Sequence, residues 1–323
     1  AYGDDIACFI IEPFIGAGGF IFASPEYLQR ARDLTKKSGA VLIFDEVVSG
    51  FRFHAGPVQT LYGIDPDLTL FGKAIGGGMP VSAVAGSDDI FSLCGQERKK
   101  EDRVKFEGGT FSGHPAAMTA GVTYLQYLIE HESEIYPKIG TWGRRIREGI
   151  EEIFSSFGFN VKCTGEGDAI APNSSLAGVQ FLRRPLARVT SPEQVWNPEI
   201  SDSDLRENVF KLEMLLEGFN TFHGFGAVSA AHKESEIQAA LDAAEKIAGK
   251  WKEKQVQDSL YDINRRYMPN VIKGRIKTAK NPQLILPYPL AIKSINPKLE
   301  TAILIRINPA AITGRIQRWN FFP

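Results

Sequence analysis

The sequence predicts an α/β protein built around a mainly parallel sheet. Of two short apolar runs, the one at 41–44 stops abruptly at two acids and the one at 68–71 ends in Gly72-Lys73; a helical segment precedes the first run. Apolar runs of this length are typical of strands that are buried on both faces. The carboxyl ends of such strands form the edge where open α/β sheets bind ligands. We therefore expect functional residues directly after these two runs.

The elements that lead up to the first run form a strand–helix–strand unit. The first strand covers residues 6–11, and the helix begins at Ser24, a capping residue followed by Pro25 in the first helical position. Gly39 is typical of a helix end. The crossover should be right-handed. Since an interior strand starts only five residues into the sequence, we expect the chain to lack the upstream part of this sheet.

Two long helices are predicted in the middle of the chain. The first runs from Pro115 to about residue 131, with an apolar stripe of Met118, Val122 and Leu125 and with Leu128 nearby. The second covers residues 136–157. A helical stretch of this length is typical of a link between a large and a small domain.

The residues after these helices predict a smaller α+β domain. Short strands at 176–182 and 227–231 alternate with helices. We therefore divide the chain into a partial large domain (1–135), a linking helix with a small C-terminal domain (136–254) and a tail (255–323). The last helix of the small domain should bury one face, formed by Ile237, Leu241, Ala244, Ala248 and Trp251.

The tail at 255–323 differs in composition from the rest of the chain. It holds eleven Lys and Arg against three Asp and Glu, together with seven prolines. This composition favours a loosely ordered addition. The alternative is a basic segment that contacts nucleic acid or a partner protein. Its aromatic residues are too scattered to stack on bases, so we do not expect a nucleic-acid partner.

The overall composition excludes few function classes. Apolar residues make up 43% of the chain, charged residues 23%, and the net charge is −1, which is typical of a globular protein. The scattered Cys8, Cys94 and Cys163 have no zinc or disulfide spacing. We therefore expect no metal, and reduced thiols in a cytoplasmic protein. No signal peptide is recognisable, and no apolar run approaches the ~18 residues of a membrane span.

An acid and an amine follow the two apolar runs. Asp45 comes directly after the first run, and Lys73 follows the second, 28 residues after Asp45. This pair suits pyridoxal phosphate, because an amine forms a Schiff base with its aldehyde while an acid pairs with its pyridine nitrogen. The glycine run at 76–78 provides a backbone that can turn tightly against a bound group.

Two alternatives are open for Asp45. Four apolar residues before two acids also satisfy the Walker B pattern of an ATPase, which a Walker A loop should accompany. Gly72-Lys73 is no such loop, because Ala74 follows it and residue 67 is Asp where glycine is needed. A true loop could lie upstream of this sequence. The other alternative is an ordinary buried acid.

Three groups of residues, in the right order, resemble the class III aminotransferases, which are pyridoxal-phosphate-dependent enzymes of fold type I. The resemblance runs from about Ile6 to about Lys250 and is strongest to the glutamate-1-semialdehyde aminomutase branch. Members also carry a phosphate-binding loop and a ring-stacking aromatic residue upstream, neither of which is present here. The matching groups are Phe44-Asp45-Glu46-Val47 with Gly50-Phe51-Arg52, Gly72-Lys73 with Gly76-Gly77-Gly78-Met79-Pro80, and Gly109-Thr110-Phe111-Ser112-Gly113 with Pro115.

The resemblance implies roles for four residues near the two strand ends. Lys73 would be the Schiff-base lysine, which also moves a proton once the substrate amine has displaced it. Asp45 would hold the ring nitrogen, and Val47 would pack on one face of the ring. A plain core valine is the alternative for Val47. Glu12, directly after the first strand, matches an acid near the substrate.

The resemblance also implies a homodimer with shared active sites. In the family, the positions of Gly109 and Thr110 serve the phosphate of the cofactor in the neighbouring subunit. The two glycines before Thr110 let backbone N–H groups approach an anion. The alternative is that Thr110 only caps a turn.

The implied activity is transfer of an amino group between a small amino donor and a small oxo acceptor. The alternative is the aminomutase reaction, which moves the amine within one molecule. The aminomutase has an asparagine where this chain has Ala17, and an acid in the region that here is His223-Gly224-Phe225-Gly226. Both departures favour a transaminase. A further alternative is an inactive fragment that acts only as a binding protein.

Overall fold

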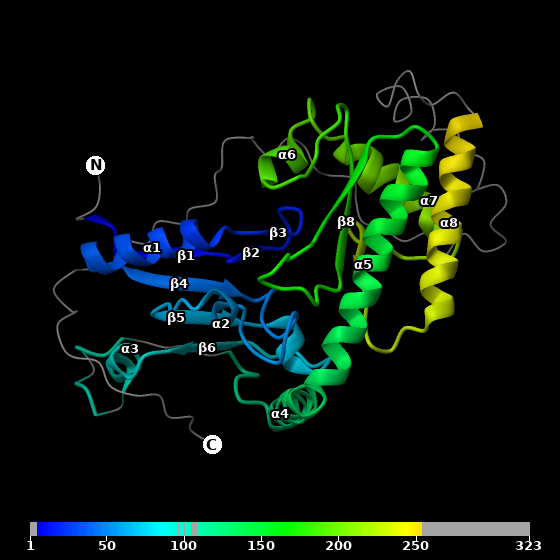
Figure 1. The fold of residues 1–323 in the computed structure, drawn as a ribbon. Coiled ribbons are helices and arrows are strands. Elements are labelled where there is room, and N and C mark those ends of the chain that lie inside the picture. The colour runs from blue at the N-terminus through cyan, green and yellow to red at the C-terminus, as the bar shows by residue number, and fades with distance from the viewer. Residues whose placement is uncertain (1–4, 96, 100, 105–108, 254–323) are drawn as a thin grey trace. The chain divides into compact units, whose positions relative to one another are not determined.

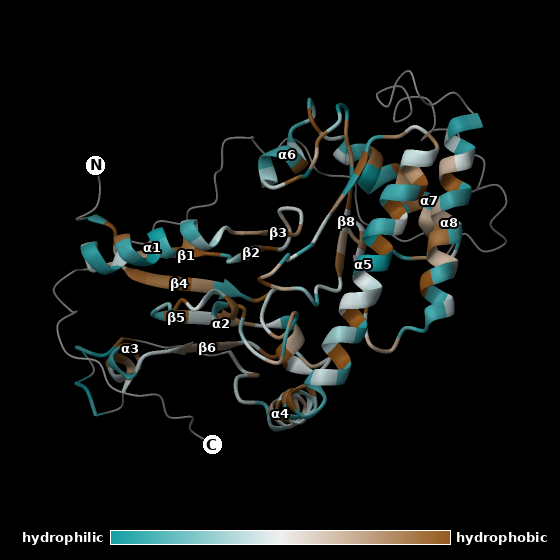
Figure 2. Cartoon of the chain, in the orientation of Figure 1, coloured by the Kyte–Doolittle hydropathy of each residue, from teal (hydrophilic) through white to brown (hydrophobic). Residues whose placement is uncertain are grey.

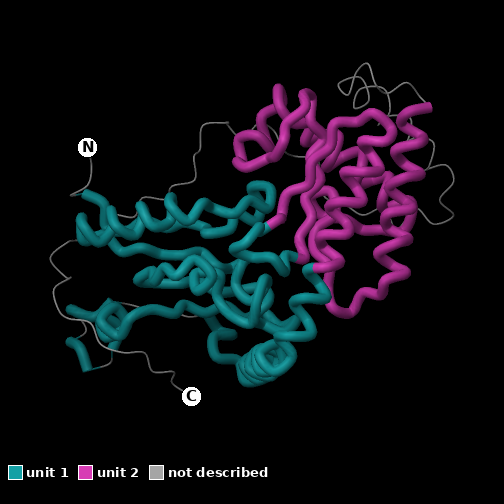
Figure 3. Tube along the Cα trace, in the orientation of Figure 1, with its two compact units in different colours: residues 1–140, 167–174, 302–323 teal, residues 141–166, 175–301 magenta. Residues whose placement is uncertain are grey.

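The computed structural model describes residues 5–253 except for 96, 100 and 105–108 (Figure 1). The described chain falls into two compact units (Figure 3). Unit 1 holds residues 5–140 and 167–174, and unit 2 holds 141–166 and 175–253. The predicted tail at 255–323 lies outside the described residues.

Unit 1 is built on a four-stranded, mainly parallel sheet, as predicted. Its order is β1 (Cys8–Ile11), β4 (Val41–Glu46), β5 (Leu68–Phe71) and β6 (Ala83–Gly86). The first three strands are parallel neighbours, and β6 pairs antiparallel to β5. Helix α1 (Pro25–Ser38) connects β1 to β4, so the predicted strand–helix–strand unit is confirmed.

The ends of α1 follow local chemistry. The Ser24 hydroxyl accepts a hydrogen bond from the Tyr27 N–H, and Gly39 adopts the left-handed conformation with φ 73°. The apolar face of α1 packs on the sheet, where Leu28, Leu42 and Phe44 are fully buried in one cluster. Burial of these side chains stabilises the pairing of α1 with β4.

The two long helices of the middle of the chain are α4 (Pro115–Glu130) and α5 (Glu132–Ser156). The predicted apolar stripe of α4 is wrong, because Met118 and Val122 are 38% and 56% exposed. The buried face instead carries Ala117, Gly121 and Leu128. At Gly121 the helix approaches the Ile75 carbonyl closely, which a side chain at this position would prevent.

Unit 2 is an α+β unit with its own antiparallel sheet, ordered β7 (Val161–Thr164), β8 (Leu176–Phe181) and β9 (Gly224–Ala227). Helices α7 (Lys211–Leu216) and α8 (Glu234–Glu253) belong to the same unit. The buried residues of unit 2 form one large cluster. Its centre is aromatic, with edge-to-face and tilted contacts among Phe154, Phe159, Phe181, Phe210 and Trp251.

The predicted buried face of the last helix is confirmed, since Ile237, Leu241, Ala244, Ala248 and Trp251 are all buried in α8. The predicted strand at 227–231 is wrong, because β9 ends at Ala227. Gly224 and Gly226 adopt positive φ values of 94° and 98° inside the strand. A side chain at Gly224 would lie 2.7 Å from the Val179 Cβ atom, so these glycines serve close strand contact and not only a turn.

The remaining described elements are short. They are β2 (Phe14–Ile15), β3 (Ile21–Phe22), α2 (Gln59–Tyr62), η2 (Lys73–Gly76), α3 (Asp88–Phe91), η3 (Ser92–Cys94), α6 (Pro192–Trp196) and η4 (Leu205–Phe210). No described helix is long and apolar enough to cross a membrane.

Candidate active site

Three charged residues lie at the carboxyl edge of the unit 1 sheet. Glu12 directly follows β1, Asp45 is the next-to-last residue of β4, and Lys73 lies two residues after β5. Because these strands are parallel neighbours, their ends meet at one edge. Figure 2 shows β4 as hydrophobic until its hydrophilic end. The sheet thus brings together an amine and two acids that are far apart in sequence.

The pKa of Glu12 reports the neighbouring charges. Burial raises the pKa of this carboxyl above its ordinary value, and the Gly16 N–H, which donates to Glu12 Oε2 at 3.0 Å, acts in the opposite direction. The charge of Asp45 raises the same pKa, and the charge of Lys73 lowers it. Both groups are therefore within electrostatic reach of Glu12.

Asp45 and Glu46 point to opposite faces of β4, because side chains alternate along a strand. Asp45 is half-buried, whereas Glu46 is fully buried on the face of β4 that also carries Leu42 and Phe44. Glu46 accepts hydrogen bonds from the backbone N–H groups of Val58, at 2.6 Å, and Gln59, at 2.8 Å. Burial nevertheless raises its pKa to about 7. Glu46 therefore anchors the loop that follows Asp45, a role that the sequence analysis did not assign.

Val47 connects Asp45 to the turn that carries Lys73. The Val47 N–H donates to Asp45 Oδ1 at 3.0 Å, which orients the carboxylate. The half-buried Val47 side chain lies against Gly72, where an added Cβ atom would be only 3.1 Å from Val47 Cγ1. Gly72 thus permits the Lys73 turn to approach Val47.

Lys73 is exposed and begins the 3₁₀ turn η2. Its φ is +46°, in the left-handed region that non-glycine residues rarely adopt. Strained backbone of this kind persists only where the surroundings hold it, and it is enriched at functional sites. The amine is therefore presented on a constrained turn.

The arrangement fits pyridoxal phosphate at three points. Asp45 supplies a carboxylate for the ring nitrogen, Val47 supplies an apolar contact, and Lys73 supplies an amine within the same edge of the sheet. Gly109 and Thr110 are exposed in a turn closed by the Ser112 N–H, which donates to the Gly109 carbonyl at 2.9 Å. Within the described residues, no contact joins Thr110 to the other three.

The histidines near these motifs have local partners. His114 caps α4, with Nδ1 accepting from the Ala117 N–H at 3.4 Å. His223 lies in unit 2, with Nδ1 at 3.0 Å from Glu207 Oε1. Among the described residues, no group of His, Cys, Asp and Glu could hold a metal ion.

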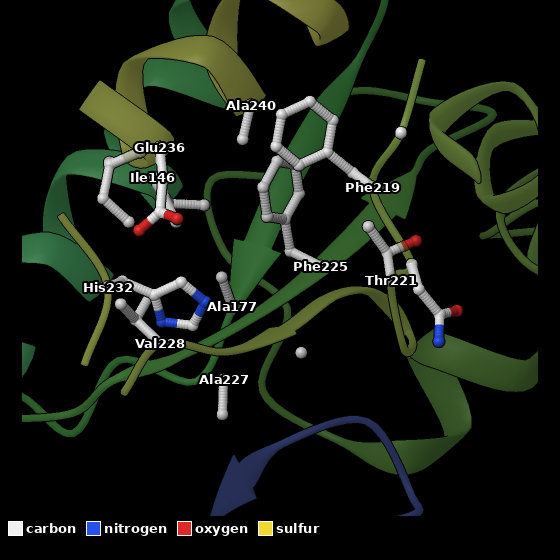
Figure 4. A pocket seen from close by; sticks show the side chains of 14 residues that line it. Ile146, Ala177, Phe219, Thr221, Phe225, Ala227, Val228, His232, Glu236 and Ala240 are labelled. Carbon is white, nitrogen blue, oxygen red and sulfur yellow. The ribbon is translucent and has the colours of Figure 1, made fainter. Parts of the chain in front are cut away.

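A separate cavity of about 350 Å³ lies within unit 2 (Figure 4). Phe219, Phe225 and Ile146 contribute apolar walls, and His232 and Glu236 contribute polar groups. Both polar groups are engaged at the start of α8. His232 Nδ1 accepts from the Ser229 N–H at 3.0 Å, and Glu236 Oε2 accepts from the Lys233 N–H at 2.7 Å. None of the predicted site residues lines this cavity.

Comparisons with known proteins match most of the described chain. The class III aminotransferase family matches residues 1–171. A glutamate-1-semialdehyde 2,1-aminomutase from Sulfurihydrogenibium azorense is 46% identical over 247 residues, which are 75% of this chain and 53% of that protein. The chain spans about half the length of the curated relatives it matches.

Two solved structures support the same fold. An omega-transaminase from Sphaerobacter thermophilus is 30% identical, with a TM-score of 0.63 over 77% of this chain and 53% of that chain. A transaminase with pyridoxal phosphate bound is 25% identical, with a TM-score of 0.61 over 78% of this chain and 54% of that chain. The predicted fold class, fold type I with a mainly parallel sheet, is confirmed.

Proposed function

The chain belongs to the class III aminotransferase family, and we propose that it carries the catalytic lysine of a pyridoxal-phosphate-dependent aminotransferase. The enzyme would transfer an amino group between a small amino donor and a small oxo acceptor. The observation that carries this proposal is the juxtaposition of Lys73, Asp45 and Glu12 at one edge of the sheet. When bound, the cofactor supplies an electron sink for the substrate carbon.

Each residue of the site has a proposed task. The Lys73 amine would hold the cofactor, and once the substrate amine had taken its place, the freed Lys73 amine would move a proton at the substrate carbon. Asp45, oriented by the Val47 N–H, holds the ring nitrogen in its protonated form. The Val47 side chain packs on one ring face. Glu12, whose pKa burial raises, contacts the substrate.

We also propose a homodimer in which Gly109 and Thr110 bind the cofactor phosphate of the partner subunit. Unit 1 exposes apolar side chains around this turn and on the following helix, including Phe111 at 75%, Val122 at 56% and Ile129 at 59% exposure. Exposed apolar side chains in this density are typical of a protein interface. The proposed domains are the cofactor-binding part at 1–135 and the link with the small domain at 136–254.

Aminomutase activity is the second candidate function. It is favoured by the 46% identity to a glutamate-1-semialdehyde 2,1-aminomutase. Ala17 and the acid-free segment 223–226 favour the transaminase instead. The need for a second substrate distinguishes the two, because a mutase converts its substrate alone into an isomer that keeps one amine, whereas a transaminase needs a separate oxo acceptor and releases an oxo product without the amine.

We place the enzyme in the cytoplasm. The support is that Cys8, Cys94 and Cys163 are all free thiols, which is typical of a reducing compartment.

The direct test is a titration of the chain with pyridoxal phosphate, followed by borohydride reduction and peptide mapping. A pyridoxyl group on Lys73, together with visible absorbance that saturates at one cofactor per chain, would support the proposal. Labelling spread over surface lysines, with no saturation, would contradict it.

A further inference from the structure

The turn that carries Lys73 is too short to hold its own conformation. The turn, residues 72–77, has long backbone hydrogen bonds at both ends, from the Ile75 N–H to the Gly72 carbonyl at 3.3 Å and from the Gly77 N–H to the Ala74 carbonyl at 3.2 Å. Lys73 within it adopts φ +46°. Left-handed backbone at a lysine costs free energy, so neighbouring elements must impose it.

Helix α4 supplies one of these constraints through a glycine. Gly121 is buried in the middle of α4, and a Cβ atom added there would lie 2.9 Å from the Ile75 carbonyl oxygen. The atom it would meet belongs to the backbone, not to a flexible side chain. Glycine inside a helix destabilises it relative to alanine, so this position gives up helix stability and allows a close approach to the turn.

The other end of the turn touches the same helix. A Cβ atom added at Gly77 would lie 2.8 Å from the Tyr124 Cβ atom and 2.9 Å from the Ala120 carbonyl oxygen. On the opposite side, a Cβ atom added at Gly72 would lie 3.1 Å from Val47 Cγ1. Ile75 fixes the centre of the turn with only 5% of its surface exposed. The turn is therefore clamped between α4 and the residues that follow Asp45.

From this geometry we infer that Gly121 is a positioning residue for Lys73. Its missing side chain lets α4 press against the Ile75 carbonyl, and this contact holds the backbone of Lys73 in the left-handed region and so sets the direction of its amine. The importance of this positioning for catalysis rests on the proposed function. The conformational part concerns this chain's own backbone and can be measured without cofactor.

The test compares Gly121→Ala with Gly249→Ala. Gly249 is the matched control, because it is also a helical glycine and an added Cβ atom would meet only the Phe157 ring at 3.7 Å. The full chain is labelled with ¹³C-lysine, and the Lys73 signal is assigned by its loss in Lys73→Asn. The Cα and Cβ shifts of Lys73 report its φ directly. They should move toward ordinary values in Gly121→Ala and stay unchanged in Gly249→Ala.

Cofactor chemistry gives a second readout. Borohydride trapping of pyridoxal phosphate on Lys73 should slow by about tenfold in Gly121→Ala, because a misplacement below 1 Å costs reactivity steeply.

Unchanged Lys73 shifts in a folded Gly121→Ala chain would overturn the inference. If the shifts move but the unsubstituted chain traps no cofactor on Lys73, the positioning stands and the proposed function fails. If Gly121→Ala does not fold, Gly77→Ala is the second variant, because its added Cβ atom would lie 2.9 Å from the Ala120 carbonyl oxygen and would push the same helix away from the turn. The Lys73 shifts should then move in the same direction, and unchanged shifts there would overturn the inference.

Discussion

The two faces of strand β4 carry neighbouring carboxylates with opposite tasks. Glu46 is fully buried and ties down the loop at Val58 and Gln59 through two hydrogen bonds. Asp45, one residue earlier, is half-buried and lies within electrostatic reach of Glu12 beside Lys73. The same chemical group thus serves stability on the covered face and, under the proposed function, chemistry on the open face. Burial and surroundings, not residue type, assign the task.

The largest expected effect is loss of the amine on the open face. Lys73→Ala should abolish borohydride-trapped cofactor, because Lys73 is the lysine that lies two residues after β5, the strand paired with the end of β4 that carries Asp45. Peptide mapping after reduction measures this. Lys37→Ala, at an exposed lysine of α1, is the control and should trap cofactor normally. Full trapping on another residue in Lys73→Ala would remove Lys73 from the proposed role.

Asp45→Asn should separate chemistry from stability. The amide keeps the shape of the side chain and the acceptor for the Val47 N–H, but no anion remains to hold the ring nitrogen protonated. We expect transaminase turnover to fall by about 10²–10³, while trapping on Lys73 persists and the unfolding midpoint changes little. Unchanged turnover would show that the open face does not need this charge.

Glu46→Gln should change the free energy of unfolding, in contrast to Asp45→Asn, which should mainly change turnover. Because the folded-state pKa of Glu46 is about 7 and its ordinary value is 4.5, the folded chain binds the proton more tightly than the unfolded chain. Its contribution to stability is complete below about pH 4.5 and is lost as the pH rises through about 7. Urea unfolding between pH 5 and 8 should therefore show a decline in the free energy of unfolding of about 2–3 kcal/mol.

In Glu46→Gln this pH-dependent decline should vanish, because the amide does not titrate. The free energy of unfolding of Glu46→Gln at pH 5 should also be about 1–3 kcal/mol lower than that of the unsubstituted chain, since an amide N–H group now faces a backbone N–H group. Glu245→Gln, at an exposed position of α8, should keep the decline intact. A decline that survives in Glu46→Gln would mean that another group titrates.

The smallest expected effect concerns the turn at Thr110. If its hydroxyl binds the partner's cofactor phosphate, Thr110→Ala should weaken cofactor binding by about 1–3 kcal/mol, which is the loss of one charge-assisted hydrogen bond. Equilibrium titration by visible absorbance measures it. Ser112→Ala in the same exposed turn is the control and should bind normally. An equal loss in both variants would assign the effect to the turn and not to Thr110.

Local chemistry in the sequence was enough to predict several features. Ser24, Pro25 and Gly39 mark the ends of α1 because capping and left-handed glycine act within a few residues. The apolar runs before Asp45 and Lys73 predict parallel strands, because strands buried on both faces need apolar side chains throughout. The motifs around these residues were specific enough to identify the family.

Only the tertiary structure decided which surfaces meet. Strand alternation predicts that Asp45 and Glu46 point apart, but the packing of the segment at Val58 and Gln59 decides that Glu46 is the buried one. In α4 the apolar stripe suggested Met118 and Val122 as the packing face, whereas the helix buries Gly121 against the Ile75 carbonyl. Hydrophobicity cannot reveal this contact, because it depends on the absence of a side chain and on a backbone that is distant in sequence.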